Sequence, residues 1–172
     1  SILSGVLRPN LGKDASWEDV FQRFAGSALG DYLKKVADKG VRTSYKPQYV
    51  DRIPKSYSGR VRGLLEKTDE RGALSHLVAR LSLDGLLERE ISSLSGGELQ
   101  RVAITACLSR EADLYLLDEP SAHLDVEQRM LAAKVMRRFA ESSEKTVLVV
   151  DHDIYLIDLL AERVMVFEGQ PG

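Results

Sequence analysis

The chain reads Leu114-Tyr115-Leu116-Leu117-Asp118-Glu119-Pro120 at the point that says most about its architecture. Four apolar residues in a row are typical of a strand that is buried on both faces. Two carboxylates therefore stand at the carboxyl end of a buried strand. Parallel-sheet enzymes place their chemistry at that end, so this stretch predicts a functional site.

Asp118 and Glu119 suit different parts of phosphoryl chemistry. Magnesium keeps much of its water shell and takes few carboxylates, which fits Asp118 as a metal ligand. Glu119 is placed to orient or deprotonate an attacking water. The alternative is an acid pair that only caps the following helix. The position of the pair directly after four apolar residues favours the catalytic interpretation.

A second apolar run, Thr146–Val150, ends in Asp151-His152-Asp153. A lone histidine is more often structural than functional. If this strand lies beside the first one, however, His152 meets the acid pair at the same edge of the sheet. There it would contact a terminal phosphate or hold the attacking water.

The stretch Leu94-Ser95-Gly96-Gly97-Glu98 precedes a helical pattern. Two glycines leave backbone N–H groups unobstructed at a helix start, the serine hydroxyl adds a donor, and the helix dipole favours anions there. A terminal phosphate fits this arrangement. A glycine-rich helix start without any ligand is the plainer alternative, and the pentapeptide alone does not decide between them.

Strands and helices alternate along the second half of the chain. The expected helices begin at the glycines and run across Val126–Ala140 and Ile154–Leu160, with a last strand at Val164–Phe167. Apolar strands that alternate with helices predict an α/β fold with a parallel sheet. In the first half we expect a helix tail at Ser1–Leu7, a capping box at Ser16-Trp17-Glu18-Asp19, a second helix ending near Gly40, and a short strand at Val41–Tyr45.

The bulk composition is that of one soluble domain. The chain has 172 residues, 44% of them hydrophobic, and a formal net charge of -2, which provides no basic field for direct DNA binding. No stretch approaches the roughly 20 apolar residues of a membrane span. The single cysteine, Cys107, excludes a disulfide framework within the chain, which suits a reducing cytoplasm, and its apolar neighbours predict an inert core thiol.

Taken together, these motifs resemble the ABC ATPase family, in order and approximate spacing. The resemblance implies a P-loop NTPase fold with a helical signature subdomain at about residues 55–110 and a core part at 111–172. It identifies Gln48, which alone would mean nothing, as similar to the Q-loop. It also implies these roles: catalytic Glu119 and His152; metal-binding Asp118 and Gln48; Ser95, Gly96, Gly97 and Glu98 as the signature that completes a partner's nucleotide site; and Ser121 and Asp125 in the D-loop.

A narrower resemblance is to the ABCE subfamily of ribosome-recycling ATPases, carried by Lys46–Asp51, Leu94–Ile104, Asp118–Ser121 with Leu124–Arg129, and Val149–Asp153. It implies ATP and Mg²⁺ as cofactors, a second ABC domain bound head to tail, and ribosomal subunits with release or initiation factors as further partners, without a membrane. The stretch Leu7–Gly12 resembles the first ATPase domain of that family, whereas Val166–Pro171 is closer to the second. The longer N-terminal match favours the first.

One expected motif is missing from the sequence. No stretch has a glycine, four residues, then Gly-Lys followed by Ser or Thr, which is the loop that grips ATP phosphates. Gly5 to Asp14 imitates it, but the glycine spacing is too long and Asp14 stands where a hydroxyl belongs. We therefore expect a fragment of a longer domain, with negligible ATP affinity on its own.

Three other interpretations remain open at this stage. A chromosome-structure ATPase of the SMC or DNA-repair kind also separates its signature from the phosphate loop, although Gln48 upstream of the signature argues against it. The ATPase subunit of a transporter would dock on a membrane partner, and nothing in Arg60–Glu90 decides that. A degenerate interaction module would have no physical need for Glu119 and His152.

Overall fold

The computed structural model describes residues 16–38 and 40–164. Helices and strands alternate as expected, and short 3-10 turns (η) join some of them. In chain order the elements are α1 (Trp17–Arg23), α2 (Ala28–Ala37), β1 (Thr43–Lys46), η1 (Val50–Arg52), α3 (Ile53–Ser56), α4 (Val61–Thr68), α5 (Leu74–Arg80), η2 (Asp84–Leu86), η3 (Ile91–Ser93), α6 (Gly96–Leu108), β2 (Leu114–Asp118), α7 (Val126–Ser143), β3 (Thr146–Val150) and α8 (Ile154–Leu160).

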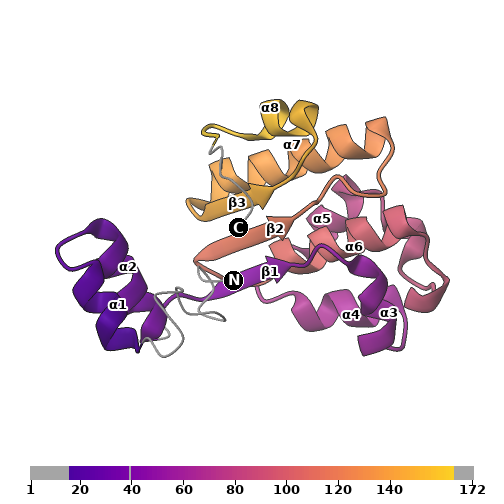
Figure 1. The fold of residues 1–172 in the computed structure, drawn as a ribbon. Coiled ribbons are helices and arrows are strands. Elements are labelled where there is room, and N and C mark those ends of the chain that lie inside the picture. The colour runs from indigo at the N-terminus through magenta and orange to yellow at the C-terminus, as the bar shows by residue number, and fades with distance from the viewer. Residues whose placement is uncertain (1–15, 39, 165–172) are drawn as a thin grey trace, which may run out of the picture.

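The three strands of the described ranges form one parallel sheet in the order β1-β2-β3. Tyr45 pairs with Leu116 and Leu116 with Leu148, so the strands are in close register. Their carboxyl ends consequently lie at the same edge (Figure 1). The predicted α/β fold with a parallel sheet flanked by helices is confirmed.

The two faces of the sheet differ in how they are covered. Tyr115, Leu117, Val147 and Val149 join the main hydrophobic core with residues of α6 and α7. Because side chains alternate along a strand, Tyr45, Leu116, Leu148 and Val150 point to the second face. On that face Tyr45 is 52% exposed and Val150 is 58% exposed.

The helices gather into two separate groups. α1 and α2 pack against each other at one side of the molecule, away from α3 to α8 (Figure 1). Ser16 caps α1 through a reciprocal capping box with Asp19, as predicted. In the larger group α6 is the most buried helix, and it contacts β1, β2, α4, α5 and α7.

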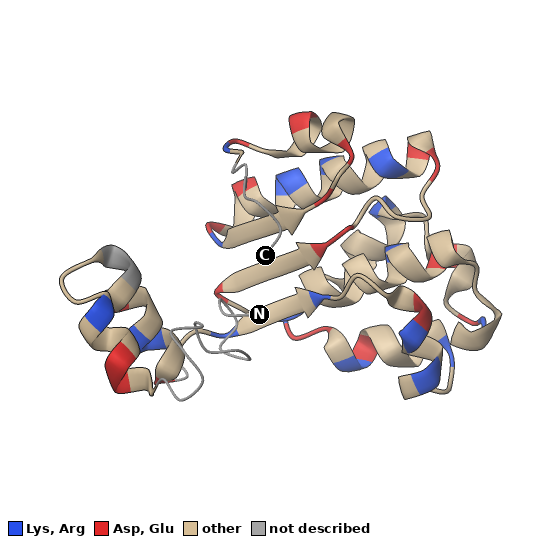
Figure 2. Cartoon of the chain, viewed as in Figure 1, with Lys and Arg blue, Asp and Glu red and all other residues tan. Residues whose placement is uncertain are grey.

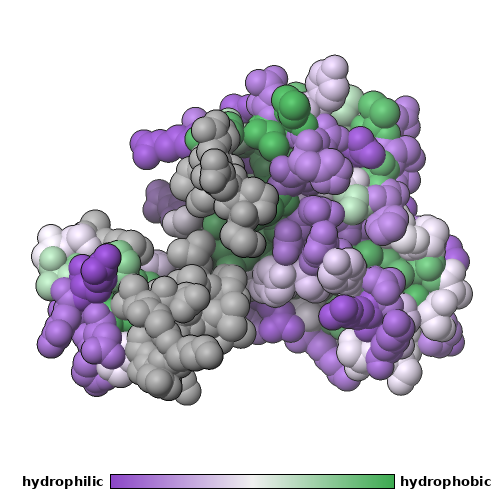
Figure 3. Space-filling view, viewed as in Figure 1, coloured by the Kyte–Doolittle hydropathy of each residue, from purple (hydrophilic) through white to green (hydrophobic). Residues whose placement is uncertain are grey.

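A single cluster of buried apolar side chains extends from Val50 to Leu156. It includes side chains of α4, α5, α6, α7 and α8, so these helices share one core. The predicted division near residue 110 into a helical subdomain and a core part stays a prediction. The visible surface is mostly hydrophilic, with hydrophobic side chains near the top where α7 and α8 lie (Figure 3).

Cys107 lies in this core, where its sulfur accepts a hydrogen bond from the Ser44 hydroxyl at 3.3 Å. Burial raises the pKa of the thiol to about 11. Since the thiolate is the reactive form, the structure agrees with the predicted inert thiol.

The predicted elements agree with the structure at most positions. β3 and α8 have the expected bounds, and α7 continues three residues beyond the expected Ala140. The expected helix tail at Ser1–Leu7 lies outside the described residues, and so does Met165 to Phe167 of the expected last strand. No helix in residues 16–38 and 40–164 combines the length and the apolar character that crossing a membrane requires.

Candidate active site

The carboxyl ends of β2 and β3 carry the acidic residues of the candidate site (Figure 2). Pairing continues to the last residue of each strand, Asp118 with Val150. The main-chain N–H of Glu119 then donates to the Val150 carbonyl at 2.7 Å. The sheet therefore fixes the backbone of Glu119 directly against the strand that leads to His152.

His152 follows β3 with a largely exposed side chain. Its Nδ1 lies 3.9 Å from Oε1 of Glu119. The two side chains form an ion pair only when the imidazole is protonated. The expectation that Glu119 and His152 meet at neighbouring strand ends is therefore met. Their roles in a reaction stay predictions.

Asp118 points to the second face of the sheet, where it meets Tyr45 of β1. The Tyr45 hydroxyl donates to Oδ2 of Asp118 at 3.2 Å. Burial, followed by the charge of Asp118, raises the pKa of Tyr45.

Magnesium is the cation that this donor set suits. Among residues 16–38 and 40–164, no group of three His, Cys, Asp or Glu side chains is arranged to hold a metal ion. Mg²⁺ does not need such a cage, because it keeps several waters and binds one or two carboxylates beside substrate phosphates. Asp118 fits that chemistry. Gln48 lies half-buried in the segment after β1.

The loop after Glu119 is tied to β3 by Asp151. Ser121 is buried, and its N–H and hydroxyl donate to the two Asp151 carboxylate oxygens at 3.0 and 2.8 Å. The N–H of Asp153 donates to Oδ1 of Asp151 at 2.9 Å. Asp151 thus joins the predicted D-loop to the segment that carries His152, a role that the sequence analysis did not assign.

Asp125, the second predicted D-loop residue, is the N-cap of α7. Its Oδ1 accepts from the N–H of Gln128 at 2.8 Å. An aspartate at a helix start also interacts favourably with the helix dipole. The geometry gives Asp125 a clear structural role, and a role toward a partner stays a prediction.

The predicted signature residues form the start of α6. Ser95 is the N-cap and Glu98 completes a capping box, with Ser95 N–H donating to Oε2 of Glu98 at 2.7 Å. The Ser95 hydroxyl accepts from Glu98 N–H at 3.3 Å. A hydroxyl can accept and donate at once, so its expected role as a donor to a phosphate stays a prediction. Glu98 also pairs with Arg89 at 2.7 Å. The hydrogen bond from Ser95 N–H, helped by Arg89, lowers the pKa of Glu98.

A neighbouring residue, His123, leaves little room for a side chain at either glycine of the signature. A Cβ on Gly96 would lie 3.0 Å from Cγ of His123, and one on Gly97 would lie 2.8 Å from the His123 carbonyl oxygen. His123 has φ 63° and lies in the D-loop, against the start of α6. The structure therefore brings the signature and the D-loop into contact.

Two further side chains reach the strand ends from within the fold. Lys46 of β1 and Gln100 of α6 are buried, and both donate to main-chain carbonyls at the end of β2. Burial lowers the pKa of Lys46 to about 8, against an upward pull from Asp118, Asp151 and Glu119. The sequence analysis missed both. The only sequence signals were that Lys46 is two residues before Gln48 and that Gln100 closely follows the signature residues.

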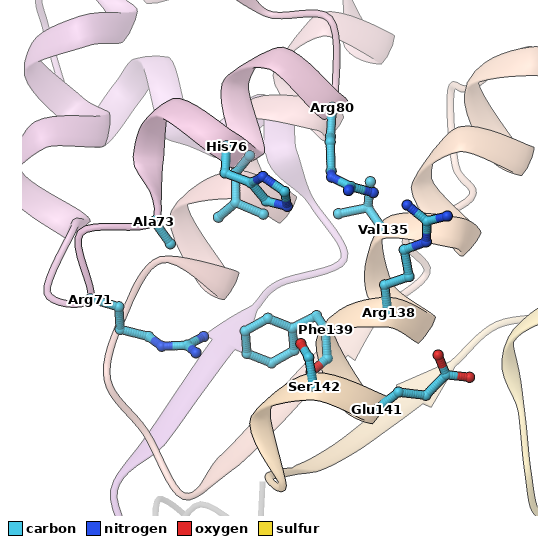
Figure 4. A pocket seen from close by; sticks show the side chains of 10 residues that line it. Arg71, Ala73, His76, Arg80, Val135, Arg138, Phe139, Glu141 and Ser142 are labelled. Atoms are coloured by element: carbon cyan, nitrogen blue, oxygen red, sulfur yellow. The ribbon is translucent and has the colours of Figure 1, made fainter.

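A pocket of about 470 Å³ lies between α5 and α7, away from these residues (Figure 4). Its walls combine apolar side chains with cationic ones, among them Arg71, Arg80 and Arg138. Arg71 lies over the ring of Phe139 at 4.7 Å. None of the predicted site residues lines this pocket.

The family described as ABC transporter matches residues 2–122. The chain belongs to the ABC ATPase family. The matched part includes the signature and the end of β2, where the geometry places the candidate site. The fold and the ordered motifs described above are therefore those of an ABC ATPase.

Within this family the chain is most similar to ABCE proteins. It is 42% identical over 174 residues to "ABC transporter E family member 1" of Arabidopsis thaliana, covering 99% of this chain and 29% of that protein. The solved structure of an RNase-L inhibitor superposes with a TM-score of 0.93 at 49% identity, covering 99% of this chain and 33% of that one. An archaeal ribosome recycling factor, solved in complex with a ribosomal stalk protein, has a TM-score of 0.86 at 50% identity over 91% of this chain and 30% of that one.

These relatives are much longer than the sequence in hand. The chain spans about a third or less of the length of each.

Proposed function

We propose that this chain is part of an ATP-hydrolysing domain of a ribosome-recycling translation factor. The observation that carries the proposal is the meeting of Asp118, Glu119 and His152 at two adjacent strand ends. A triphosphate with its magnesium ion would need a metal ligand, a base and a phosphate contact at one place. These three side chains supply that set.

The chemistry assigned to each residue follows from its position. Asp118 binds the hydrated Mg²⁺, with Gln48 as a second oxygen ligand. The ion supplies charge neutralisation for the phosphate oxygens when bound. Glu119 orients the attacking water and accepts its proton, and His152, beside it, donates a hydrogen bond to the terminal phosphate.

The start of α6 has a different purpose in this proposal. Ser95, Gly96 and Gly97 contact the ATP held by a second ABC domain that binds head to tail, and Glu98 keeps this helix start in shape. A helix start with glycine N–H groups suits a phosphate. His123 packs on the glycines, so the D-loop residues Ser121 and Asp125 lie beside that interface.

Ribosomal subunits and their termination or initiation factors are the proposed wider partners, with the cytoplasm as the location. The support is the close similarity to an archaeal ribosome recycling factor. A direct test adds ATP and a longer version of the protein to ribosomes and follows subunit separation on a sucrose gradient. Intact ribosomes at saturating protein and ATP would contradict this part of the proposal.

The decisive experiment for catalysis is Glu119→Gln in a version of the protein that includes a phosphate-binding loop. Loss of a general base typically costs 10²- to 10⁴-fold, so we expect the ATPase rate constant to fall by at least ~100-fold. Glu66→Gln, on the exposed side of α4, is the matched control and should retain the full rate. Undiminished hydrolysis by Glu119→Gln would refute the assigned base.

A second experiment addresses the missing phosphate loop. The sequence in hand lacks the lysine and the backbone donors that make charge-assisted contacts to ATP phosphates. We expect calorimetry to detect no ATP binding by this chain alone at micromolar concentrations, and binding to return when the loop is supplied. A micromolar dissociation constant for the chain alone would overturn the expectation.

A further inference from the structure

Glu119 has an unusual backbone for a residue with a side chain. Its φ is 46°, in the left-handed region that favours glycine. Such a conformation persists only where the surroundings hold it in place. The hydrogen bond from Glu119 N–H to Val150 holds one side of this residue. The other side, its carbonyl, is held by two side chains.

Lys46 reaches the end of β2 from the neighbouring strand. Only 1% of it is exposed, and its Nζ donates to the Asp118 carbonyl at 2.6 Å and to the Glu119 carbonyl at 3.1 Å. A buried lysine is costly, so it needs such partners. Here both partners are main-chain oxygens of the two residues that carry the acids.

Gln100 reaches the same carbonyl from α6. It is fully buried, and its Nε2 donates to the Glu119 carbonyl at 2.6 Å. Its own oxygen, Oε1, has no hydrogen-bond partner among the described residues. A buried amide whose oxygen lacks a hydrogen bond stabilises the fold less than an apolar side chain of the same size would. The contribution of the Gln100 amide is therefore the hydrogen bond that its NH₂ group donates to Glu119.

We infer that Lys46 and Gln100 are positioning residues for catalysis, which together hold the Glu119 carbonyl so that its carboxylate is directed to the water beside His152. The hydrogen bonds of both side chains go to main-chain oxygens of Asp118 and Glu119. They act through the main chain of Glu119. This inference rests on the proposed function, because it assumes that Glu119 is the catalytic base.

The test measures ATP hydrolysis by Lys46→Met and Gln100→Met in a version of the protein that includes a phosphate-binding loop. Both substitutions keep an unbranched side chain and remove the donor; methionine matches glutamine in length and is one atom shorter than lysine. We expect each to lower kcat by 10-fold or more while the KM for ATP stays within twofold. Thr105→Val is the matched control, because Thr105 is buried on the same helix but its hydroxyl bonds only to the Arg101 carbonyl. Its kcat should equal that of the unmodified protein.

A second arm separates positioning from a general structural role. In a Glu119→Gln background the residual rate no longer depends on a base, so adding Gln100→Met should change it by less than twofold. Thermal unfolding monitors folding of every variant. If Lys46→Met does not fold, Gln100→Met alone decides.

Two results would overturn the inference. One is a folded Gln100→Met variant with an unchanged kcat. The other is an equal loss with and without the Glu119 carboxylate. If Glu119→Gln itself hydrolyses ATP at the full rate, the proposed base fails and the inference fails with it. That outcome is distinct, because it needs no variant of Lys46 or Gln100.

Discussion

The end of β2 and the start of α6 are both predicted to handle phosphate groups, yet they are built in different ways. At the end of β2 the main chain of Glu119 is held from three directions, by Val150, Lys46 and Gln100. At the start of α6, Ser95 and Glu98 bond to each other within a single helical turn. The first site depends on distant segments, and the second is almost self-contained.

This difference indicates what each site can tolerate. A site assembled from β1, α6 and β3 forms only when the whole sheet forms, and a change at any partner reaches it. A helix start that completes its own capping box depends less on distant segments, although His123 and Arg89 also contact it. The predictions below test whether the two sites differ in this way.

The largest expected loss of stability is at Asp151, which joins the D-loop to β3. Asp151→Ala leaves the buried N–H and hydroxyl of Ser121 without their acceptors. Unsatisfied buried donors cost about 1–3 kcal/mol, so we expect the free energy of unfolding in urea to fall by about 2–3 kcal/mol. Asp158→Ala on the exposed side of α8 is the control and should change it by less than about 0.5 kcal/mol.

The next effect concerns the contact between the start of α6 and the D-loop, at Gly97. In Gly97→Ala the new methyl group meets the His123 carbonyl oxygen at 2.8 Å, and backbone cannot yield easily. Overpacking typically costs about 1–3 kcal/mol, and we expect a loss of about 1–2 kcal/mol in the same urea experiment. Gly85→Ala, with nothing within 4 Å of the new methyl, should leave stability unchanged or slightly higher. Equal changes in the free energy of unfolding at the two glycines would show that the close contact with His123 does not destabilise Gly97→Ala.

A smaller effect is expected at the cap of α6. Ser95→Ala removes the acceptor for Glu98 N–H, which should cost about 1 kcal/mol. Ser95→Asp keeps an acceptor and should restore most of that stability. Ser75→Ala, at an exposed position on α5, is the control for the change in residue type. A loss above about 3 kcal/mol at Ser95 would contradict a self-contained helix start.

The smallest effect is the pH dependence of Glu98. Its pKa is lowered in the folded state, so its ionised form stabilises the fold above the unfolded pKa of about 4.3. That contribution disappears as the pH falls through the lowered folded value. We expect Glu98→Gln to be less stable than the unmodified chain at pH 7, with the gap closing below about pH 4. A gap that stays constant from pH 7 to pH 3 would exclude this origin.

The sequence predicted those features that depend on neighbours in the chain. The capping box at Ser16, the bounds of β3 and α8 and the helix start at Gly96 all follow from residues a few positions apart. The meeting of Glu119 with His152 was also predictable, because parallel strands end at the same edge of a sheet.

The sequence could not predict side chains that act across the fold. Lys46 and Gln100 are 54 residues apart and come from different elements, yet they donate to the same carbonyl. Nothing in local spacing indicates a shared partner. The left-handed backbone of Glu119 is likewise set by packing, because glutamate does not prefer that conformation.

The second face of the sheet has a practical consequence. Tyr45 and Val150 are more than half exposed there, and the partly buried Leu148 lies on the same face, paired with the buried Leu116. Such a surface offers a binding place for apolar dyes such as ANS, even when every strand is paired. Dye fluorescence from this chain would therefore not by itself indicate a molten globule.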